Sequence, residues 1–390
     1  MSRFVQLHAL TAYPPANLNR DDTGRPKTAL LGDAQRLRIS SQSLKRAWRT
    51  SDLFASQLGS TNGHIGTRTK RVGSEWIYSK LVKDGVEAAS AMQWSVDLQR
   101  AYGEPEGEDK TNDLAVLTNT QLVHVSPTEE AKLNAFVESL SAYLRFGKAD
   151  EAVELAKKAI ERRDKSKKQD KKKANATLAK ELAGLLLDDE TTSVDIALFG
   201  RMLASVPSYN FDAAVQVAHA ITVHKAAVEE DYFSAVDDLN TGLEDRGAGH
   251  IGERGYGAGL FYLYVCINRE LLIDNLGGDV DLAGRAIQAL LHAVTQVAPT
   301  GMQNSFGSRA YASYLLAEKG NQQPRSLVQA FMKPVRPWGE NDMLSLSVQA
   351  LRQRVDNFDK VYGPCADSRC HFDAESGEGS LAEVVAFAKE

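Results

Sequence analysis

The sequence has few cysteines, no long apolar run and no excess of positive charge. Its 3 cysteines in 390 residues are too few for a disulfide framework, so we expect a reducing, cytoplasmic environment. No run of about 18 apolar residues is present, and polar residues interrupt residues 1–10, so we expect neither a membrane span nor a signal peptide. The formal net charge of -5 gives no general attraction to nucleic acid, and any such site must therefore be a local basic surface.

Motifs of several enzyme classes are also missing. The sequence contains no GxxxxGK[ST] phosphate loop, no GxSxG elbow and no HExxH helix. Cys365 and Cys370 lack a second matching pair, which disfavours a zinc site. Asp21 and Asp22 could bind a divalent metal, but a turn with paired acids is commoner and no third ligand is in view. We therefore expect a protein without a cofactor, a bound metal or a catalytic group.

The order of predicted elements indicates an α+β fold. Residues 3–13 alternate as a strand that Pro14 and Pro15 should end, and residues 43–58 predict one helix. Residues 60–190 are rich in Ala, Leu, Glu and Lys and predict amphipathic helices. Residues 194–200 alternate as a strand, residues 214–224 fit a strand or a helix, and residues 260–271 predict a strand before a helix over 280–297. This order fits a decorated split βαβ sheet of the ferredoxin or RRM kind.

The densest basic stretch lies between Ala34 and Ser51, which holds five basic residues and no acidic one. Strand alternation puts Arg36 and Arg38 on one side, and Ser40 and Ser41 are good N-cap residues for the helix that follows. A helix N-terminus lined with hydroxyl, amide and guanidinium groups suits phosphate and sugar but reads no base. A solvated basic helix with a well-made cap explains the same residues, and the stretch alone does not decide between the two.

A glycine-rich segment, residues 225–259, separates two strand candidates and could form a long hairpin arm. Tyr232, Phe233 and Ile251 would then be exposed apolar groups that stack on bases or wedge between them. The residues alone favour the plainer alternative, a surface loop whose aromatic side chains pack into the core.

Six stretches carry a resemblance to a known family. They are LNRDD (residues 18–22), RISSQSLKRA (38–47), DIALFGRM (195–202), AVQVAHAITVH (214–224), FSAVDDL (233–239) and HIG (250–252). In this order they resemble CasC, the repeated backbone subunit of the type I-E CRISPR Cascade complex. The long and uncommon RISSQSLKRA stretch makes the resemblance specific. It covers about residues 1–280.

The resemblance implies a hand-like fold and an RNA-binding, non-enzymatic role. The palm would be a modified RRM-like sheet (residues 1–59 and 191–390), the fingers a helical insertion (60–190) and the thumb a long β-hairpin (225–256). Roughly six copies would stack along one crRNA beside the other Cascade subunits, without any membrane. Each thumb would kink the guide and displace about one base in six, and the stretches between kinks would pair with target DNA in antiviral defence.

The resemblance also assigns residues. Those expected to bind the RNA are Arg20, Arg38, Ser40, Gln42, Ser43, Lys45, Arg46, Arg49, Met202, Phe233 and Ile251. The basic run over 162–173 could contact target DNA or a partner subunit. Related subunits of type III complexes cut target RNA with an aspartate. The alternative function is therefore a metal-dependent ribonuclease that uses Asp21 or Asp22.

Overall fold

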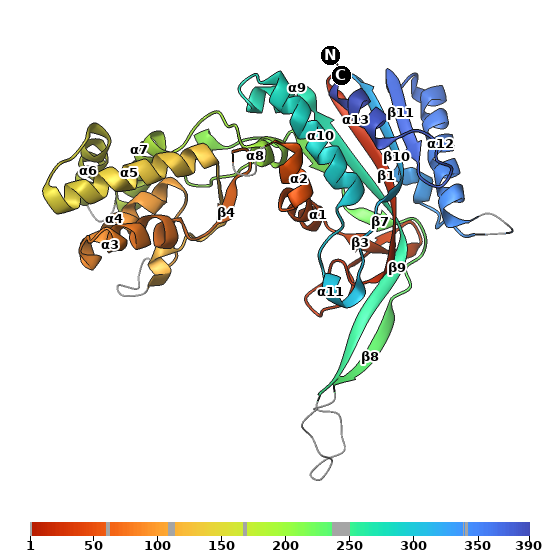
Figure 1. Ribbon diagram of the computed structural model, residues 1–390, viewed down its shortest axis with the longest axis horizontal. Coiled ribbons are helices and arrows are strands. Elements are labelled where there is room, and N and C mark those ends of the chain that lie inside the picture. Colours follow the sequence, from red (N-terminus) through yellow and green to blue (C-terminus); the bar gives the residue numbers. More distant parts are fainter. Residues whose placement is uncertain are drawn as a thin grey trace, which may run out of the picture. The chain divides into compact units, whose positions relative to one another are not determined.

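The computed structural model describes residues 2–59, 63–107, 114–166, 170–235, 250–337, 339 and 342–390. The chain divides into two compact units, and Figure 1 shows their elements. The sheet unit consists of Met1–Gly59, Val215–Glu270 and Gly284–Glu390, and the helical unit consists of Ser60–Ala214 and Leu271–Ala283. Residues 191–214, which the domain prediction places in the palm, thus belong to the helical unit.

The sheet unit is built on one antiparallel sheet. Its order is β11-β10-β1-β9-β7-β3-β2, and β6 and β8 also pair with β9. The strands are β1 (Phe4–Ala16), β2 (Thr28–Leu31), β3 (Ala34–Ile39), β6 (Val215–Val217), β7 (Ala220–Thr222), β8 (Glu229–Ala235), β9 (His250–Asn268), β10 (Ala312–Gly320) and β11 (Ser368–Asp373). Along the chain, β1, a helix, β6 and β7, β9, a helix and β10 follow the βαββαβ order of ferredoxin-like folds. The predicted α+β class is confirmed.

Strand β1 is longer than the sequence predicts. It continues through Pro14 and Pro15 to Ala16, although we expected the prolines to end it. Its register with β9 shifts between Tyr13 and Ala16, so the residues that lack an N–H group fall at the irregularity. The prolines interrupt the pairing with β9 but do not end the strand.

Helices cover both faces of the sheet. The sheet unit contains α1 (Ser41–Arg49), α2 (Asp52–Gln57), most of α10 (Val280–Gln296), α11 (Gln303–Phe306), η6 (Val328–Phe331), α12 (Met343–Tyr362) and α13 (Leu381–Lys389). A core cluster joins Leu10, Tyr262 and Leu316 of the sheet to Leu351 and Val355 of α12. Helix α13 packs against β10 and β11, and Lys389 donates a hydrogen bond to Gln288 of α10.

Two short helices replace the single helix predicted over residues 43–58. Helix α1 ends at Arg49, because Thr50 Oγ1 donates to the Arg46 carbonyl and Ser51 Oγ donates to the Trp48 carbonyl. Ser51 is also the N-cap of α2, where its side chain accepts from the Phe54 N–H. Hydroxyl groups that bond to the preceding turn and cap the next helix produce this break.

The helical unit has its own core. Its elements are β4 (Thr67–Thr69), η1 (Val72–Tyr78), α3 (Ser79–Lys83), α4 (Ala88–Leu98), η2 (Gln99–Ala101), η3 (Leu114–Leu117), β5 (Val123–Val125), α5 (Pro127–Phe146), α6 (Glu151–Asp164), α7 (Lys171–Leu186), α8 (Val194–Phe199) and η5 (Pro207–Tyr209), with part of α9 (Arg269–Asn275). Leu133, Val137, Leu140, Leu182 and Leu186 are fully buried between its helices. Helices predicted for residues 129–163 and 176–187 are confirmed.

One predicted strand in this unit is wrong. Residues 194–199 form helix α8, which ends at Gly200 with a φ of 78°. Its residues Val194 to Leu198 are all buried, so apolar side chains occur at every position and their alternation does not distinguish a strand from a helix. Within the described chain, no helix is long and apolar enough to cross a membrane.

Candidate nucleic-acid interface

Helix α1 presents an N-terminus suited to an anion. Ser40 is its N-cap, as predicted, and the Ser40 side chain accepts from the Ser43 N–H at 3.3 Å. The Ser40 N–H in turn donates to Asn19 Oδ1 at 2.9 Å, which ties the cap to the loop before β2. The first turn contains no acidic residue. The positive end of the helix dipole is therefore not neutralised by a carboxylate of its own helix.

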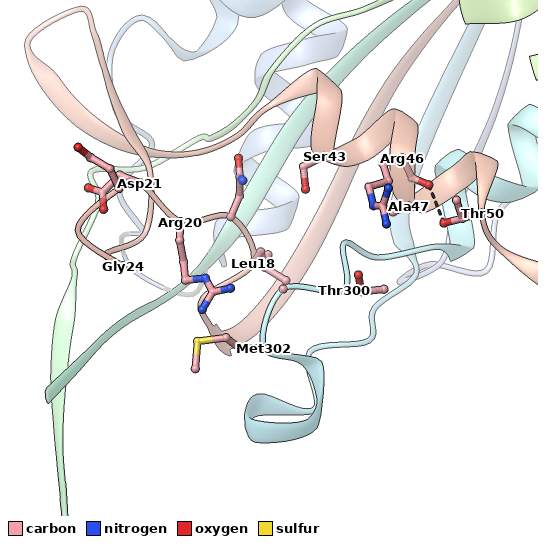
Figure 2. Close-up of a pocket in the computed structure, with 13 residues that line it drawn as sticks. Leu18, Arg20, Asp21, Gly24, Ser43, Arg46, Ala47, Thr50, Thr300 and Met302 are labelled. Atoms are coloured by element: carbon pink, nitrogen blue, oxygen red, sulfur yellow. Dashed lines mark hydrogen bonds between the residues drawn. The ribbon is translucent and has the colours of Figure 1, made fainter. Parts of the chain in front are cut away.

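Helix α1 has one side that packs into the core and another that lines a pocket. Leu44, Ala47 and Trp48 are buried and hold the helix against the core. Ser43, Arg46 and Thr50 line an open pocket of about 750 Å³, together with residues 18–22, Gly24 and residues 300–302. Figure 2 shows Arg46 on the helix and Arg20 on the facing loop, with both guanidinium groups in the pocket. Two arginines, three residues with hydroxyl groups (Ser43, Thr50 and Thr300) and two acidic residues (Asp21 and Asp22) thus line one hollow.

Asp21 and Asp22 also line the pocket, and the contacts of Asp21 lie within its own loop. Asp21 Oδ1 accepts hydrogen bonds from the Thr23 N–H, the Thr23 hydroxyl and the Arg25 N–H, at 2.8 to 3.0 Å. These bonds, led by that of the Thr23 hydroxyl, lower the pKa of Asp21. This oxygen orders the loop around Gly24, and Figure 2 shows Asp21 away from Arg46. Among the described residues, no group of three His, Cys, Asp or Glu side chains could hold a metal ion.

The far wall of the pocket comes from a loop that the sequence did not reveal. A Cβ atom at Gly301 would lie 2.3 Å from the Leu18 carbonyl oxygen, so only glycine allows this approach. Met302 follows with a φ of 50°, in the left-handed region that non-glycine residues rarely occupy. Residues held in such a conformation concentrate at functional sites. No pattern in the sequence distinguishes Thr300, Gly301 and Met302.

A second polar stripe on α1 lies outside the pocket. It contains the exposed Gln42 and the half-buried Lys45 and Arg49, three and four residues apart. Partial burial lowers the pKa of the Lys45 ammonium. The stripe continues the polar surface of the pocket around the helix, which agrees with the sequence-based expectation that these three residues share a face.

The two arginines of β3 have different environments. Arg36 is fully buried and donates to the Thr222 carbonyl at 3.0 Å and the Phe331 carbonyl at 2.8 Å. Strand alternation puts Arg36 and Arg38 on one side of β3, but backbone carbonyls inside the protein bind the Arg36 guanidinium, which therefore does not contribute to a basic surface. Arg38 is partly exposed and bonds to His219 Nδ1 at 2.8 Å. Burial and the neighbouring Arg38 lower the pKa of His219, so a neutral imidazole accepts this bond.

The predicted thumb is a β-hairpin of β8 and β9, with Phe233 opposite Gly252. Figure 1 shows it projecting from the sheet. Its base is braced, because Asn17 donates to the Gly255 carbonyl at 2.9 Å and Arg25 forms an ion pair with Glu230. Residues 236–249, which include part of the FSAVDDL stretch, lie outside the described residues.

The two predicted wedge residues lie on adjacent strands of this hairpin. The Phe233 ring is partly exposed, and the Arg254 guanidinium lies 4.4 Å from its centroid. The backbone of Ile251 pairs with Ser234, but its side chain lies outside the described part of the structure.

Met202 lies in the helical unit, at the end of the DIALFGRM stretch. Its side chain is 70% exposed, although its neighbours are firmly held. Arg201 is buried, donates to both carboxylate oxygens of Glu129 at 2.7 and 2.8 Å and pairs with Phe211 through the backbone. Asp195 accepts from His124 Nε2 at 2.9 Å and from the Gly66 N–H. Most of this motif therefore anchors the segment that presents Met202.

Comparison with known proteins places this chain in a family. The family model described as CT1975-like protein matches residues 5–389, which is nearly the whole chain. The chain belongs to the CT1975-like family. Comparison with curated proteins gives no match.

The CT1975-like chain is also similar to solved structures. One is a chain of a "CRISPR RNA-guided surveillance complex, pre-nicking", with 26% identity, a TM-score of 0.74 and coverage of 99% of this chain and 100% of that chain. A chain of a "CRISPR RNA-guided surveillance complex" has 24% identity, a TM-score of 0.65 and coverage of 98% and 99%, which supports the fold alone.

The CT1975-like structure groups some of the predicted residues and separates others. Arg20, Ser43 and Arg46 meet at the pocket, and Ser40 caps the helix that forms one wall. Arg38, the second stripe of α1 and Phe233 belong to the same sheet unit but do not line the pocket. Met202 belongs to the helical unit. The RNA-binding role of all these residues stays a prediction.

Proposed function

We propose that this protein binds the backbone of a crRNA without reading its sequence, as a repeated subunit of a CRISPR RNA-guided surveillance complex of the Cascade type. The observation that carries the proposal is the pocket between α1 and the facing loop, where Arg20, Arg46, Ser43 and Thr50 surround one hollow. Guanidinium and hydroxyl groups bind phosphate and sugar oxygens, which are the same in every guide.

The charge distribution fits attraction of nucleic acid to one local basic surface rather than to the whole protein. The protein carries a formal net charge of -5, yet the stretch that forms β3 and α1 contains no acidic residue. An anion near the first turn of α1 gains from the positive end of the helix dipole and from Arg46, which lies one turn after Ser43. A local basic site on a protein of net negative charge favours a nucleic-acid strand that fits the site over nucleic acid in general.

Similarity over the full chain supports membership in such a complex. The 26% identical structure belongs to an RNA-guided surveillance complex and is covered completely. A subunit of this kind would bind other copies of itself and the other subunits, and the type I-E resemblance extends the proposal to a guide that each thumb kinks. The stretches between kinks would then pair with target DNA.

Two matched substitutions test the pocket. Arg20→Gln and Arg46→Gln keep polar side chains but remove the charge that would contact phosphate. Each should weaken binding of single-stranded RNA equally for several unrelated sequences and reduce the magnitude of the salt slope by roughly 0.7. Lys360→Gln, which removes an exposed charge from α12, is the control. Unchanged affinity and slope in both pocket variants would contradict the proposed site.

A further inference from the structure

Three basic side chains meet where β2, β3 and β7 lie side by side in the sheet. Lys27 directly precedes β2, Arg38 lies near the end of β3, and His219 directly precedes β7. The Arg38 N–H donates to the Lys27 carbonyl at 2.8 Å. Arg38 also pairs with Ile221, which follows His219 by two residues. Residues two apart on a strand share a face, so the three side chains come to the same side of the sheet.

Within the described residues, no acid neutralises these side chains. The Arg38 guanidinium bonds to the Thr28 carbonyl at 3.3 Å and to His219 Nδ1 at 2.8 Å, and in that part of the chain no carboxylate pairs with Arg38 or Lys27. Burial lowers the pKa of His219, and the charges of Arg38 and Lys27 lower it further. Arg38 and Lys27 are the only charged groups of the described chain that act on this imidazole. Neighbouring cations without a counterion favour the arrival of an anion.

The hydrogen bond from Arg38 fixes the tautomer of His219. A guanidinium has only donors, so Nδ1 accepts and the proton of the neutral ring lies on Nε2. His219 is exposed, and Nε2 has no hydrogen-bond partner among the described residues. The ring therefore offers one N–H group to a ligand.

We propose that Lys27, Arg38 and His219 hold one phosphate of the bound strand, and that His219 takes up a proton when this phosphate binds. The inference rests on the proposed function, which supplies the strand. Arg38 stands two residues before Ser40, the N-cap of α1, so the three side chains adjoin the surface already proposed for the RNA. Histidine and arginine N–H groups and an ammonium are strong donors to phosphate oxygens.

Proton uptake follows from this geometry. In the free protein, protonation adds a third positive charge beside Arg38 and Lys27, and the new Nδ1–H can no longer accept from Arg38. A phosphate removes both penalties, because it attracts the imidazolium and accepts from the released guanidinium. The proton comes from the solvent and goes to Nδ1. The pKa of His219 lies below 6.5 in the free protein and rises in the complex. RNA affinity therefore increases as the pH falls through this range, by at most about tenfold per pH unit for each site.

The pKa of the His219 ring, measured by NMR, tests the proposal directly. The protein is labelled with ¹³C at histidine Cε1, and the ring signals are followed from about pH 8 to about pH 6 with and without saturating oligouridine, whose bases do not titrate in this range. The signal that is missing from His219→Gln belongs to His219. We expect its pKa to be higher in the complex. An unchanged pKa in a protein that binds oligouridine would overturn this site and leave the proposed function standing, whereas a protein that binds no RNA would refute both.

Variants make the pH dependence of RNA affinity specific to this ring. His219→Gln keeps a neutral N–H donor, so it should bind with nearly wild-type affinity at about pH 8 and lose the increase at lower pH. His292→Gln, on α10 of the same unit, is the matched control and should keep the increase. Lys27→Gln should weaken binding at every pH and reduce the magnitude of the salt slope by roughly 0.7. An increase that persists in His219→Gln, or a wild-type affinity that does not change with pH, would sink the proposal.

Discussion

The ring of Phe233 lies over Gly252 on the neighbouring strand of the thumb. A Cβ atom at position 252 would stand 2.5 Å from Cζ of the ring, closer than van der Waals radii allow. The Arg254 guanidinium lies 4.4 Å from the ring centroid and adds a cation–π interaction. The absence of a side chain at position 252 therefore sets where the Phe233 ring lies on the hairpin.

Gly252→Ala should move the Phe233 ring without removing it. If Phe233 wedges between bases, a 2-aminopurine next to the wedge becomes unstacked and brightens when the RNA binds. Gly252→Ala and Phe233→Ala should both reduce this increase, while Ser234→Ala, on the same strand, should leave it intact. An equal increase in all variants would show that the ring does not contact the bases.

Lys45→Ala combined with Arg49→Ala should weaken RNA binding about equally for every sequence. Both cations lie on the second stripe of α1, and removing one cation that neutralises a phosphate lowers the magnitude of the salt slope on a single strand by roughly 0.7. Lys180→Ala on α7, an exposed cation of the helical unit, is the control. Affinities measured from low to high salt check the prediction, and an unchanged slope would count against the stripe.

Asp21→Ala should loosen the loop that carries Arg20 and so reduce RNA affinity. The Oδ1 atom that this substitution removes accepts three hydrogen bonds from Thr23 and Arg25. Asp21→Asn keeps an oxygen acceptor and should retain most of the affinity, and Asp22→Ala is a control for the neighbouring charge.

The same variants separate the binding role from the ribonuclease alternative. The assembled complex with target RNA and Mg²⁺ should leave the RNA intact. Specific cuts that disappear in Asp21→Asn or Asp22→Ala would establish the enzyme instead.

The sheet unit should lose stability as the pH falls below about 6.5, the ordinary pKa of His. His8 is fully buried, bonds to Tyr262 and Glu318, and burial lowers its pKa despite the nearby Glu318 carboxylate. The unfolded chain therefore takes up this proton first, and the free energy of unfolding falls by at most about 1.4 kcal/mol per pH unit from this group.

Hydrogen exchange of β1 amides in urea, measured from pH 7.5 down to 5, follows this decrease in stability. His8→Gln removes the titrating ring and should make the pH dependence shallower, even if the variant is less stable overall. A wild-type profile that stays flat over this range would show that His8 takes up its proton equally in both states.

The sequence was informative where a structure depends on neighbouring residues. The cap at Ser40 follows from its residue type and place before an apolar helix, and the long helices of the helical unit follow from their periodicity. Arg36 could not be placed in this way. Its charge is satisfied by the carbonyls of Thr222 and Phe331, far away in the chain, and only the fold brings them together.

The candidate sites depend on the same long-range interactions. Arg20 and Arg46 were predicted, but the opposite wall at Gly301 and Met302 comes from a loop about 250 residues later. Tyr102 and Ser205 carry no motif, and only the fold brings the two residues to the wall of one pocket. Local patterns thus predicted which residues carry charge, whereas the pockets that residues far apart in the chain form together could be recognised only in the structure.

The mass of the assembly on RNAs of increasing length tests the central claim most directly. The protein is mixed with unrelated single-stranded RNAs up to the length of a guide, and the mass of each complex is measured by native mass spectrometry. A repeated backbone subunit should add one further copy for each fixed increment of RNA length, independently of sequence. A single copy at every length would contradict the account.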